Sequence, residues 1–333
     1  MRTAVVILNW NTEDLLRAFL PSLVASCPPD AAVIVADNGS TDASLKLLSD
    51  SFPGVRTIAL GQNYGFTGGY NRALAQTEAE YFVLINSDID VSPGWLEPLV
   101  AHMDTHPGCG VCGPKLHALV PDGSGGYGRT SRFEYAGAAG GFVDRYGYPF
   151  CRGRVLSRTE EDTGQYDTPC SLLWVSGACL MTRSSLWREL GGLDDRFFAH
   201  MEEIDYCWRA CLKGYSVEVV PQSCVWHLGG GTLAPSSPFK LKLNYRNNLL
   251  LLENNLPDTV GPGAARSRIA FRRLLDAGSA LVYLLTGRMQ YARAVRDAHR
   301  EYRTLRRQAP SRAVPSSAVP GYRNICILIH RKI

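Results

Sequence analysis

Four continuous apolar runs alternate with stretches of helical spacing near the start of this chain. The runs TAVVILNW, AAVIVADNGS, VRTIALG and EYFVLINSD have the length and composition of buried strands, because a strand covered on both faces has no polar face to show. Residues 12–26, 42–52 and 65–77 follow the first three runs with helical spacing, and Thr12 is a candidate N-cap. This order predicts an α/β fold with a mostly parallel central sheet flanked by helices.

The rest of the chain is less regular. Glycine and aromatic residues crowd residues 109–167, which favours long loops and short strands. Beyond Phe239 the apolar spacing becomes helical, and prolines and small residues then dominate. We therefore expect a large domain over residues 1–255, a basic helical appendage over 256–308 and a disordered tail over 309–333.

Composition and charge indicate in which cellular compartment the protein works and what kind of partner it contacts. The 333 residues carry a net charge of +4, and much of the excess lies in an arginine-rich segment after residue 264. Such a segment favours an anionic neighbour, and no motif points to nucleic acid. Ten cysteines without a secretory leader are typical of free thiols in a reducing cytoplasm. No apolar run reaches the roughly 18 to 20 residues of a membrane span, so none is expected.

Polar residues gather where the predicted strands end. Parallel sheets bind ligands at the carboxyl ends of their strands, and those ends carry Asn9, Asn11, Asp37 and the segment 86–90. Asp37 is placed to accept hydrogen bonds from a ribose or a base edge. The alternative is a simple turn before a helix capped by Ser40.

The stretch LINSDID presents two carboxylates, Asp88 and Asp90, after an apolar strand. Oxygen ligands of this kind suit Mg²⁺ or Mn²⁺ bridging to a substrate diphosphate, although an Asx turn explains the same residues. The glycines of residues 61–73 let backbone approach a ligand, but the pattern is neither a dinucleotide fingerprint nor a phosphate-binding P-loop. Hydride transfer and ATP hydrolysis therefore lose their best support.

Three acids, Glu202, Glu203 and Asp205, run directly into Tyr206 and residues that prefer burial. Two explanations are open. Either the acids favour the positive end of a helix dipole, or carboxylates are held at the rim of a site.

Taken in order, these motifs resemble glycosyltransferase family 2, most closely the bacterial branch with the rhamnosyltransferases of cell-wall and O-antigen assembly. The resemblance covers roughly residues 3–255. It is carried by VVILNWN, ADNGSTD, NYGFTGGYN, INSDID, VSGACLM, GGLDDRFFAHMEEIDYCWR, VWHLGGGT and NYRNNLLLL. It implies a GT-A fold, with a nucleotide-sugar half over 1–108 and an acceptor-binding and catalytic half over 109–255. It also implies a divalent metal, Mg²⁺ or Mn²⁺.

The resemblance also implies roles for single residues. Asp88 matches the last acid of a D-x-D metal motif, with Asn86 where many members have Asp, so Asp90 is a compensating candidate. His227 matches a histidine that completes the metal site in some members. The nucleotide site is expected to comprise Asn9, Asn11, Asp37, Asn63, Gly65 and Asn86.

The acid cluster then matches the family's Glu-Asp pair, whose second member is the general base. That position is Glu203, with an extra methylene compared with Asp, so Glu202 remains the alternative. The resemblance implies an inverting transfer from a nucleotide-diphosphate sugar, with dTDP-rhamnose from the nearest branch, to a glycan or lipid-linked glycan. A single base facing the acceptor fits one displacement.

Three alternatives stay open. A nucleotide-sugar nucleotidyltransferase has a related core, but the lysine-rich phosphate loop that it needs is missing after the first strand. A degenerate member that binds nucleotide or glycan without turnover is motivated by Asn86 and Glu203. The basic helical segment either contacts the cytoplasmic face of a membrane as a peripheral anchor, or packs on the catalytic domain or in a homodimer.

Overall fold

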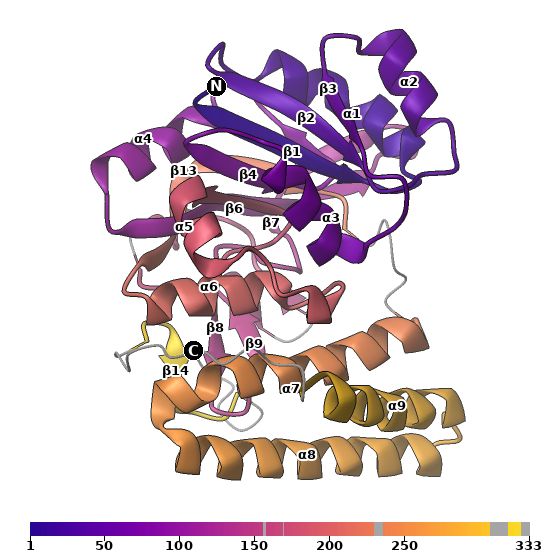
Figure 1. The fold of residues 1–333 in the computed structure, drawn as a ribbon, viewed down its shortest axis with the longest axis vertical. Helices are drawn as coiled ribbons and strands as arrows, with labels where there is room; N and C mark the ends of the chain where they lie inside the picture. Colours follow the sequence, from indigo (N-terminus) through magenta and orange to yellow (C-terminus); the bar gives the residue numbers. More distant parts are fainter. Residues whose placement is uncertain (156–157, 169, 230–235, 307–318, 328–333) are drawn as a thin grey trace.

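A computed structural model describes residues 1–155, 158–168, 170–229, 236–306 and 319–327 (Figure 1). The strands are β1 Thr3–Asn9, β2 Ala31–Asp37, β3 Arg56–Ala59, β4 Tyr81–Ile85, β5 Ile89–Val91, β6 Cys109–Pro121, β7 Tyr127–Phe133, β8 Gly141–Asp144, β9 Pro149–Cys151, β10 Arg154–Val155, β11 Arg158–Thr159, β12 Cys179–Arg183, β13 Ser216–His227 and β14 Tyr322–Arg323. The helices are α1 Glu13–Ala25, α2 Ser44–Ser51, α3 Gly65–Ala75, α4 Glu97–Thr105, α5 Ser184–Leu190, α6 Glu202–Leu212, α7 Pro238–Val260, α8 Pro262–Leu285 and α9 Met289–Leu305, with a short 3₁₀ turn at Asp195–Phe197.

One mixed sheet organises the described part of the chain. Eight of its nine strands follow the order β3-β2-β1-β4-β12-β6-β13-β5, and β7 pairs with β6. Strands β1 to β4 are mutually parallel, and β12 is antiparallel to both β4 and β6. The predicted α/β architecture is confirmed. The sequence predicted short strands and long loops after residue 109, but β6 is 13 residues long.

The apolar runs are continuous because both faces of the sheet are buried. In β1, Ala4 and Val6 join one hydrophobic cluster, while Val5 and Ile7 join another on the opposite face. Successive side chains of a strand point to opposite faces, so each face receives every second residue. The strand therefore has no polar side, which is what its sequence shows.

The strand order places a crevice beside β1. The chain passes from β1 outward to β2 and β3, and then returns to the other side of β1 with β4. At such a switch point the connections leave in opposite directions, and the carboxyl ends of the two strands are left open for a ligand. Asn9 ends β1, and Asn86 follows β4 directly.

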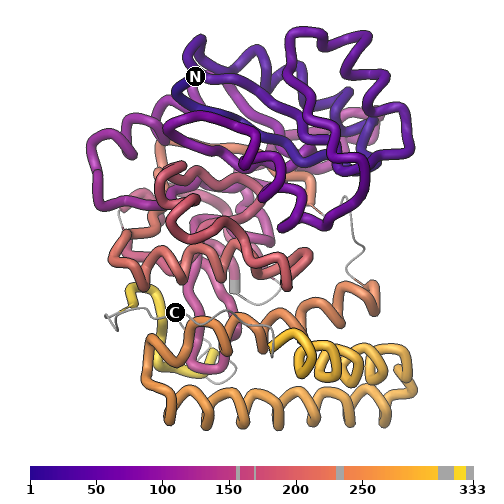
Figure 2. The backbone as a smooth tube through the Cα atoms, viewed as in Figure 1, coloured from indigo at the N-terminus to yellow at the C-terminus, as the bar shows by residue number. Residues whose placement is uncertain are grey.

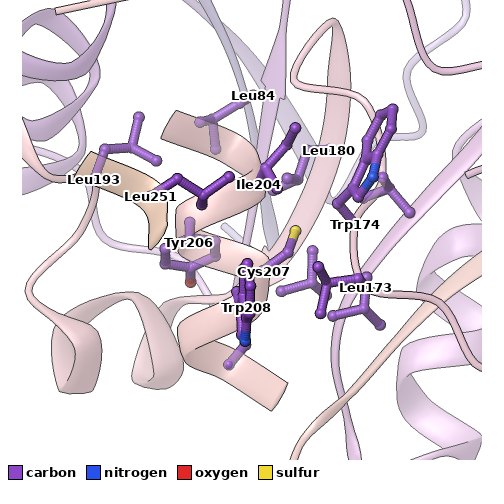
Figure 3. Packing of buried hydrophobic residues seen from close by; sticks show 14 of the residues in the cluster. Leu84, Leu173, Trp174, Leu180, Leu193, Ile204, Tyr206, Cys207, Trp208 and Leu251 are labelled. Atoms are coloured by element: carbon purple, nitrogen blue, oxygen red, sulfur yellow. The ribbon is translucent and has the colours of Figure 1, made fainter. Parts of the chain in front are cut away.

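Helix α6 is buried along almost its whole length. Ile204, Tyr206, Cys207 and Trp208 pack against residues of β4, β12 and α7, as Figure 3 shows. Trp208 is 0% exposed, and its indole Nε1 donates to Thr259 Oγ1 at 2.9 Å. The acids at the start of α6 are consequently fixed by a rigid, fully packed helix.

Helices α7, α8 and α9 contact one another at the end of the molecule opposite β1 to β4 (Figure 1). The predicted boundary after residue 255 falls inside α7, and α7 also contacts α6. Residues 238–260 therefore pack on the large domain as well as on the appendage. Among the described residues, no helix is long and apolar enough to cross a membrane.

The chain beyond residue 318 differs in part from the expected disordered tail. Residues 319–327 are placed against the core, with β14 parallel to β8 in a second sheet of order β11-β10-β9-β8-β14 (Figure 2). Tyr322 packs beside Trp208, with ring centroids 5.7 Å apart. Aromatic burial outweighs the local proline-rich composition here. The rest of the expected tail, 309–318 and 328–333, lies outside the described residues.

Replacing Trp208 with Ala should lower the free energy of unfolding by about 3–5 kcal/mol, because removal of a fully packed indole leaves a cavity. Trp10→Ala is the matched control, since Trp10 is 40% exposed and its loss should cost less than about 0.5 kcal/mol. Urea unfolding midpoints measure both. Equal losses in the two variants would contradict the assignment of α6 to the core.

Candidate active site

The ends of β1 and β2 are tied together by a polar network. Asn9 Nδ2 donates to Asp37 Oδ1 at 2.9 Å and to Ser40 Oγ at 3.0 Å, and Asn9 is paired with Asp37 in the sheet register. Asn11 Oδ1 accepts from the Thr41 amide at 2.7 Å. Thr12 is not an N-cap through its side chain, because its hydroxyl donates to Asn9 Oδ1 at 2.6 Å. The structure therefore brings the predicted Asn9, Asn11 and Asp37 together.

A second polar group stands at the start of α3. Asn63 Oδ1 accepts from the Gly65 amide at 2.8 Å and from Asn38 Nδ2 at 3.1 Å, and Asn38 also donates to the Gly65 carbonyl. Asn38 follows Asp37 directly, so it links this turn to the end of β2. The sequence pointed to Asn63 and Gly65 but did not single out Asn38.

Asp88 and His227 meet across the sheet, although 138 positions separate them in the numbering. His227 Nε2 lies 3.2 Å from Asp88 Oδ1, and its Nδ1 lies 3.5 Å from Glu134 Oε1. All three side chains are buried. Glu134 was not predicted, because it comes from the glycine-rich loop after β7 and carries no local motif.

Charge concentrates on this buried imidazole. Burial alone would lower the pKa of His227, but hydrogen bonds and charge from Asp88 and Glu134 raise it to about 10. Burial likewise opposes ionisation of Asp88, yet the contact with His227 leaves its pKa below the usual value. Two carboxylates and an imidazole form a donor set that suits a divalent cation, which would bind the imidazole once the ring has lost a proton.

Asp90 does not join this cluster, contrary to the expectation from the sequence. Its carboxylate binds Arg129 Nε at 2.7 Å and accepts from Ser22 Oγ at 3.4 Å. Asp90 is the middle residue of β5, between the buried Ile89 and Val91. Strand alternation therefore turns its side chain away from the face on which its neighbours lie.

Asn86 lies beside the segment that supports Glu203. The Asn86 amide donates to the Ala178 carbonyl at 2.9 Å. A β-carbon placed on the preceding Gly177 would lie 3.3 Å from Glu203 Cβ, so Glu203 packs directly over this glycine. The Gly177–Ala178 step thus connects the turn carrying Asn86 with the acid cluster.

The loop before α6 has an unusual backbone. Phe198, His200 and Met201 all have positive φ, at 64°, 71° and 69°. Non-glycine residues adopt such angles only where the surroundings over-determine them, and such strain gathers at functional sites. Burial also lowers the pKa of His200 to about 4, which keeps its imidazole neutral.

Two elements hold this loop. The amides of Phe66 and Thr67, in the first turn of α3, donate to the Phe198 carbonyl at 2.7 and 3.2 Å. A side chain at Gly65 would collide with the Phe198 ring, which explains the glycine of NYGF. The loop is therefore bonded to the same helix start that carries Asn63.

On its other side, the loop accepts hydrogen bonds from two adjacent residues of α7. Asn247 Nδ2 lies 3.0, 2.7 and 2.7 Å from the carbonyl oxygens of Phe197, Ala199 and His200. Arg246 adds a hydrogen bond to the Phe197 carbonyl at 2.7 Å. The motif NYRNN was noticed in the sequence, but its polar residues had no assigned role. Their contacts are long-range and leave no local signal.

The acid cluster divides into two kinds of carboxylate. Asp205 is fully buried and structural, because it binds Arg209 Nε at 2.7 Å and accepts from Asn254 and Asn255 at 2.9 and 2.8 Å. Glu202 is buried and Glu203 partly so, and the Oε2 atom of each has no hydrogen-bond partner among the described residues. A buried carboxylate oxygen without a hydrogen bond lowers the stability of the fold. Such oxygens therefore indicate a binding or catalytic site rather than a structural role.

The two glutamates differ in their ionisation. Burial and then the charge of Glu203 raise the pKa of Glu202 well above its usual value. Burial raises the pKa of Glu203 to about 7. Near neutral pH Glu203 is therefore the first of the two carboxyl groups to ionise, while Glu202 stays protonated.

This raised pKa makes a prediction about stability. A carboxyl with a pKa of about 7 when folded and about 4.5 when unfolded contributes nothing at pH 4 and disfavours folding by about 3 kcal/mol at pH 8. Glu203→Gln should therefore raise the free energy of unfolding at pH 8 by up to that amount and leave it nearly unchanged at pH 4. Glu97→Gln, at an exposed acid of α4, is the control. If the Glu203→Gln variant is less stable than the unaltered protein at pH 8, burial of the ionised Glu203 carboxylate does not destabilise the fold, and the prediction is wrong.

The chain has clear relatives. A profile of the family described as Glycosyl transferase family 2 matches residues 4–185, more than half of the chain. The N-acetylglucosaminyl-diphospho-decaprenol L-rhamnosyltransferase of Mycobacterium tuberculosis is 27% identical over 234 residues, which cover 67% of this chain and 75% of that protein.

Solved structures share the fold at low identity. GalNAc-T7 with UDP, GalNAc and Mn²⁺ has a TM-score of 0.57 and 19% identity, over 74% of this chain and 47% of that one. S. aureus TarS 1-349 in complex with UDP-GlcNAc has a TM-score of 0.53 and 18% identity, over 91% of this chain and 82% of that one. The expected GT-A-like fold is thereby confirmed, and the matching profile shows that this chain belongs to glycosyl transferase family 2.

Proposed function

We propose that this glycosyltransferase is inverting, and that it moves a sugar from a nucleotide-diphosphate donor to a glycan or lipid-linked glycan. One observation carries the proposal. The buried Glu202–Glu203 pair has unpartnered oxygens at the end of a strained loop, and that loop is bonded to the start of α3. A carboxylate held in this way beside the open ends of β1 and β4 is suited to act on a substrate rather than to stabilise the fold.

The donor nucleotide is assigned to the network at the ends of β1 and β2. Asp37 and Asn9 offer carboxylate and amide groups at the switch point of the sheet, where a nucleoside binds in open α/β folds. Asn11 extends this group to residues 40–42. Asn63 and Gly65 border it through Asn38, and Asn86 lies on the β4 side.

Asp88 and His227 are the proposed ligands of a divalent metal, Mg²⁺ or Mn²⁺. Their oxygen and nitrogen donors fit such an ion, and Glu134 is placed to orient the imidazole of His227. A bound cation would offset the negative charge that the leaving diphosphate gains. Asp90 has no part in this assignment, because it is engaged with Arg129.

Glu203 is the proposed general base. The acceptor hydroxyl must lose its proton as it attacks, and a carboxylate with a pKa of about 7 is well matched to that task at neutral pH. Glu202, whose pKa lies higher, stays protonated beside it and adds no second negative charge. A single base facing the acceptor supports one displacement, which inverts the anomeric centre.

The mycobacterial relative suggests the identity of the substrates. Its name describes transfer of L-rhamnose to a decaprenol-linked N-acetylglucosaminyl diphosphate. We therefore assign dTDP-rhamnose as the first donor to test and a lipid-linked glycan as the acceptor. UDP-sugars are the second choice, because the two structural neighbours are described with UDP or UDP-GlcNAc. A lipid-linked acceptor would lie at a membrane, and we propose its cytoplasmic face as the place of the reaction.

Metal binding can be tested apart from turnover. Asp88→Asn and His227→Ala should each weaken Mn²⁺ binding about tenfold or more in the presence of dTDP or UDP, and Glu134→Gln should weaken it by about 10-fold. Asp90→Asn is the control and should change it by less than about twofold, because Asp90 is paired elsewhere. Calorimetric titration measures all four. Equal losses in the Asp88 and Asp90 variants would contradict the assignment.

Turnover is tested with a donor panel. Purified protein should release nucleoside diphosphate from one donor among dTDP-rhamnose and common UDP- and GDP-sugars, and EDTA should stop the release. Glu203→Gln should reduce it by about 10²-fold or more, within the range of general base catalysis. NMR of the transferred sugar should show the inverted anomer. Metal-dependent nucleotide binding without release from any donor or with any acceptor would favour the binding-only alternative.

A further inference from the structure

The outer face of α8 is apolar along most of its length. Of the large hydrophobic side chains on it, Leu274 is 65% exposed, Leu281 56% and Leu285 79%. These positions recur at intervals of seven and four residues, so they lie along one side of the helix. Further exposed apolar side chains on the same helix are Phe271, Val282 and Leu284, and Met289 follows just after it.

No exposed charge interrupts this face. Between Arg266 and Arg288, a stretch that the structure describes completely, four residues carry charge. Arg272 and Asp276 are buried and paired with each other at 2.8 Å, while Arg268 and Arg273 are only partly exposed. A contiguous exposed apolar surface of this kind is unusual on a protein that stays in water, and it marks a contact site.

The charge around the face is of one sign. Helices α8 and α9 together contain eight arginines and three acidic residues. None of the three acids is exposed and free: Asp276 is buried, while Asp297 and Glu301 are bonded to basic neighbours. Arg266 and Arg288 stand exposed at the two ends of the face. This surface is complementary to an anionic one.

An anionic lipid surface fits these features better than a second copy of the chain. Two copies joined through this face would bring arginine-rich helices together and would bury no acid between them. A bilayer offers hydrocarbon to the leucines and headgroup phosphates to the arginines at the same time. The overall geometry agrees, because α8 lies along the end of the molecule away from the main sheet (Figure 1).

We propose that the outer face of α8, centred on Leu274, Leu281 and Leu285, lies in the headgroup region of an anionic membrane. Helix α7 then lies between this face and the start of α6, where Glu202 and Glu203 lie, since α7 contacts both α8 and α6. The proposal rests on exposed residues far from the donor site, so it stands or falls independently of the proposed reaction.

The test is vesicle flotation of the full chain. The probes are vesicles of phosphatidylcholine alone and of phosphatidylcholine with an equal amount of phosphatidylglycerol. The triple variant Leu274→Gln, Leu281→Gln, Leu285→Gln keeps helix-forming residues in α8. Its control is Val24→Gln, Leu45→Gln, Val120→Gln, which changes three exposed apolar side chains elsewhere, at 40%, 41% and 43% exposure.

The unaltered chain should bind the phosphatidylglycerol vesicles about tenfold more strongly than phosphatidylcholine alone, and high salt should weaken this binding. The affinity of the α8 variant for the phosphatidylglycerol vesicles should be lower by about tenfold or more, and the control variant should bind as the unaltered chain does. Circular dichroism and thermal melting confirm that both variants fold. Failure of the unaltered chain to float, or equal flotation of the folded α8 variant, overturns the proposal. A dimer in sedimentation velocity that only the α8 variant abolishes, without lipid binding, would assign the face to a second copy.

Discussion

Asn247 lies within 3.0 Å of the carbonyl oxygens of Phe197, Ala199 and His200, and this contact is what keeps the loop before α6 in its strained form. A side-chain amide replaces the water that three exposed carbonyls would otherwise bind. The loop's opposite side is bonded to the first turn of α3. Because α3 begins at Gly65, whose amide donates to Asn63, one loop joins the proposed nucleotide site to the proposed base. Helix α7 is therefore part of the site, although it contributes no group that touches a reacting atom in this account.

The short acid cluster illustrates how neighbouring carboxylates acquire different roles. Asp205 faces the interior and is neutralised by Arg209 and satisfied by two asparagines of α7. The glutamates follow the strained loop directly, each has an oxygen without a partner among the described residues, and burial raises the pKa of both. The helix dipole favours all three acids equally, so it cannot distinguish them. What distinguishes them is the direction in which each side chain leaves a helix packed on nearly all sides.

Local patterns predicted the local part of this structure. The apolar runs identified β1 to β4, since burial on both faces leaves a continuous signal, and the glycosyltransferase resemblance supplied the fold. The resemblance also marked Asp88, His227 and the two glutamates as candidates. It could not supply Glu134, Arg246 or Asn247, whose roles arise from contacts between distant segments. The sequence prediction placed Asp90 among the metal ligands because it considered only the residue type. It did not take into account that side chains alternate between the two faces of β5, which directs Asp90 toward Arg129. Because of the proline-rich composition, a disordered tail was predicted where the short strand at Tyr322 lies. Packing of Tyr322 on Trp208 stabilises this strand.

The central claim is that Glu203 is the base and that Glu202 is its protonated neighbour. The most direct measurement is the pH dependence of sugar transfer, followed from pH 5 to 9 in the unaltered enzyme and in Glu202→Gln. We expect activity to rise through a pKa of about 7 in both proteins, because Gln at position 202 resembles the neutral carboxyl that it replaces. If Glu202→Gln abolishes transfer across the whole range, while Glu203→Gln retains it, the base is Glu202 and the assignment is wrong.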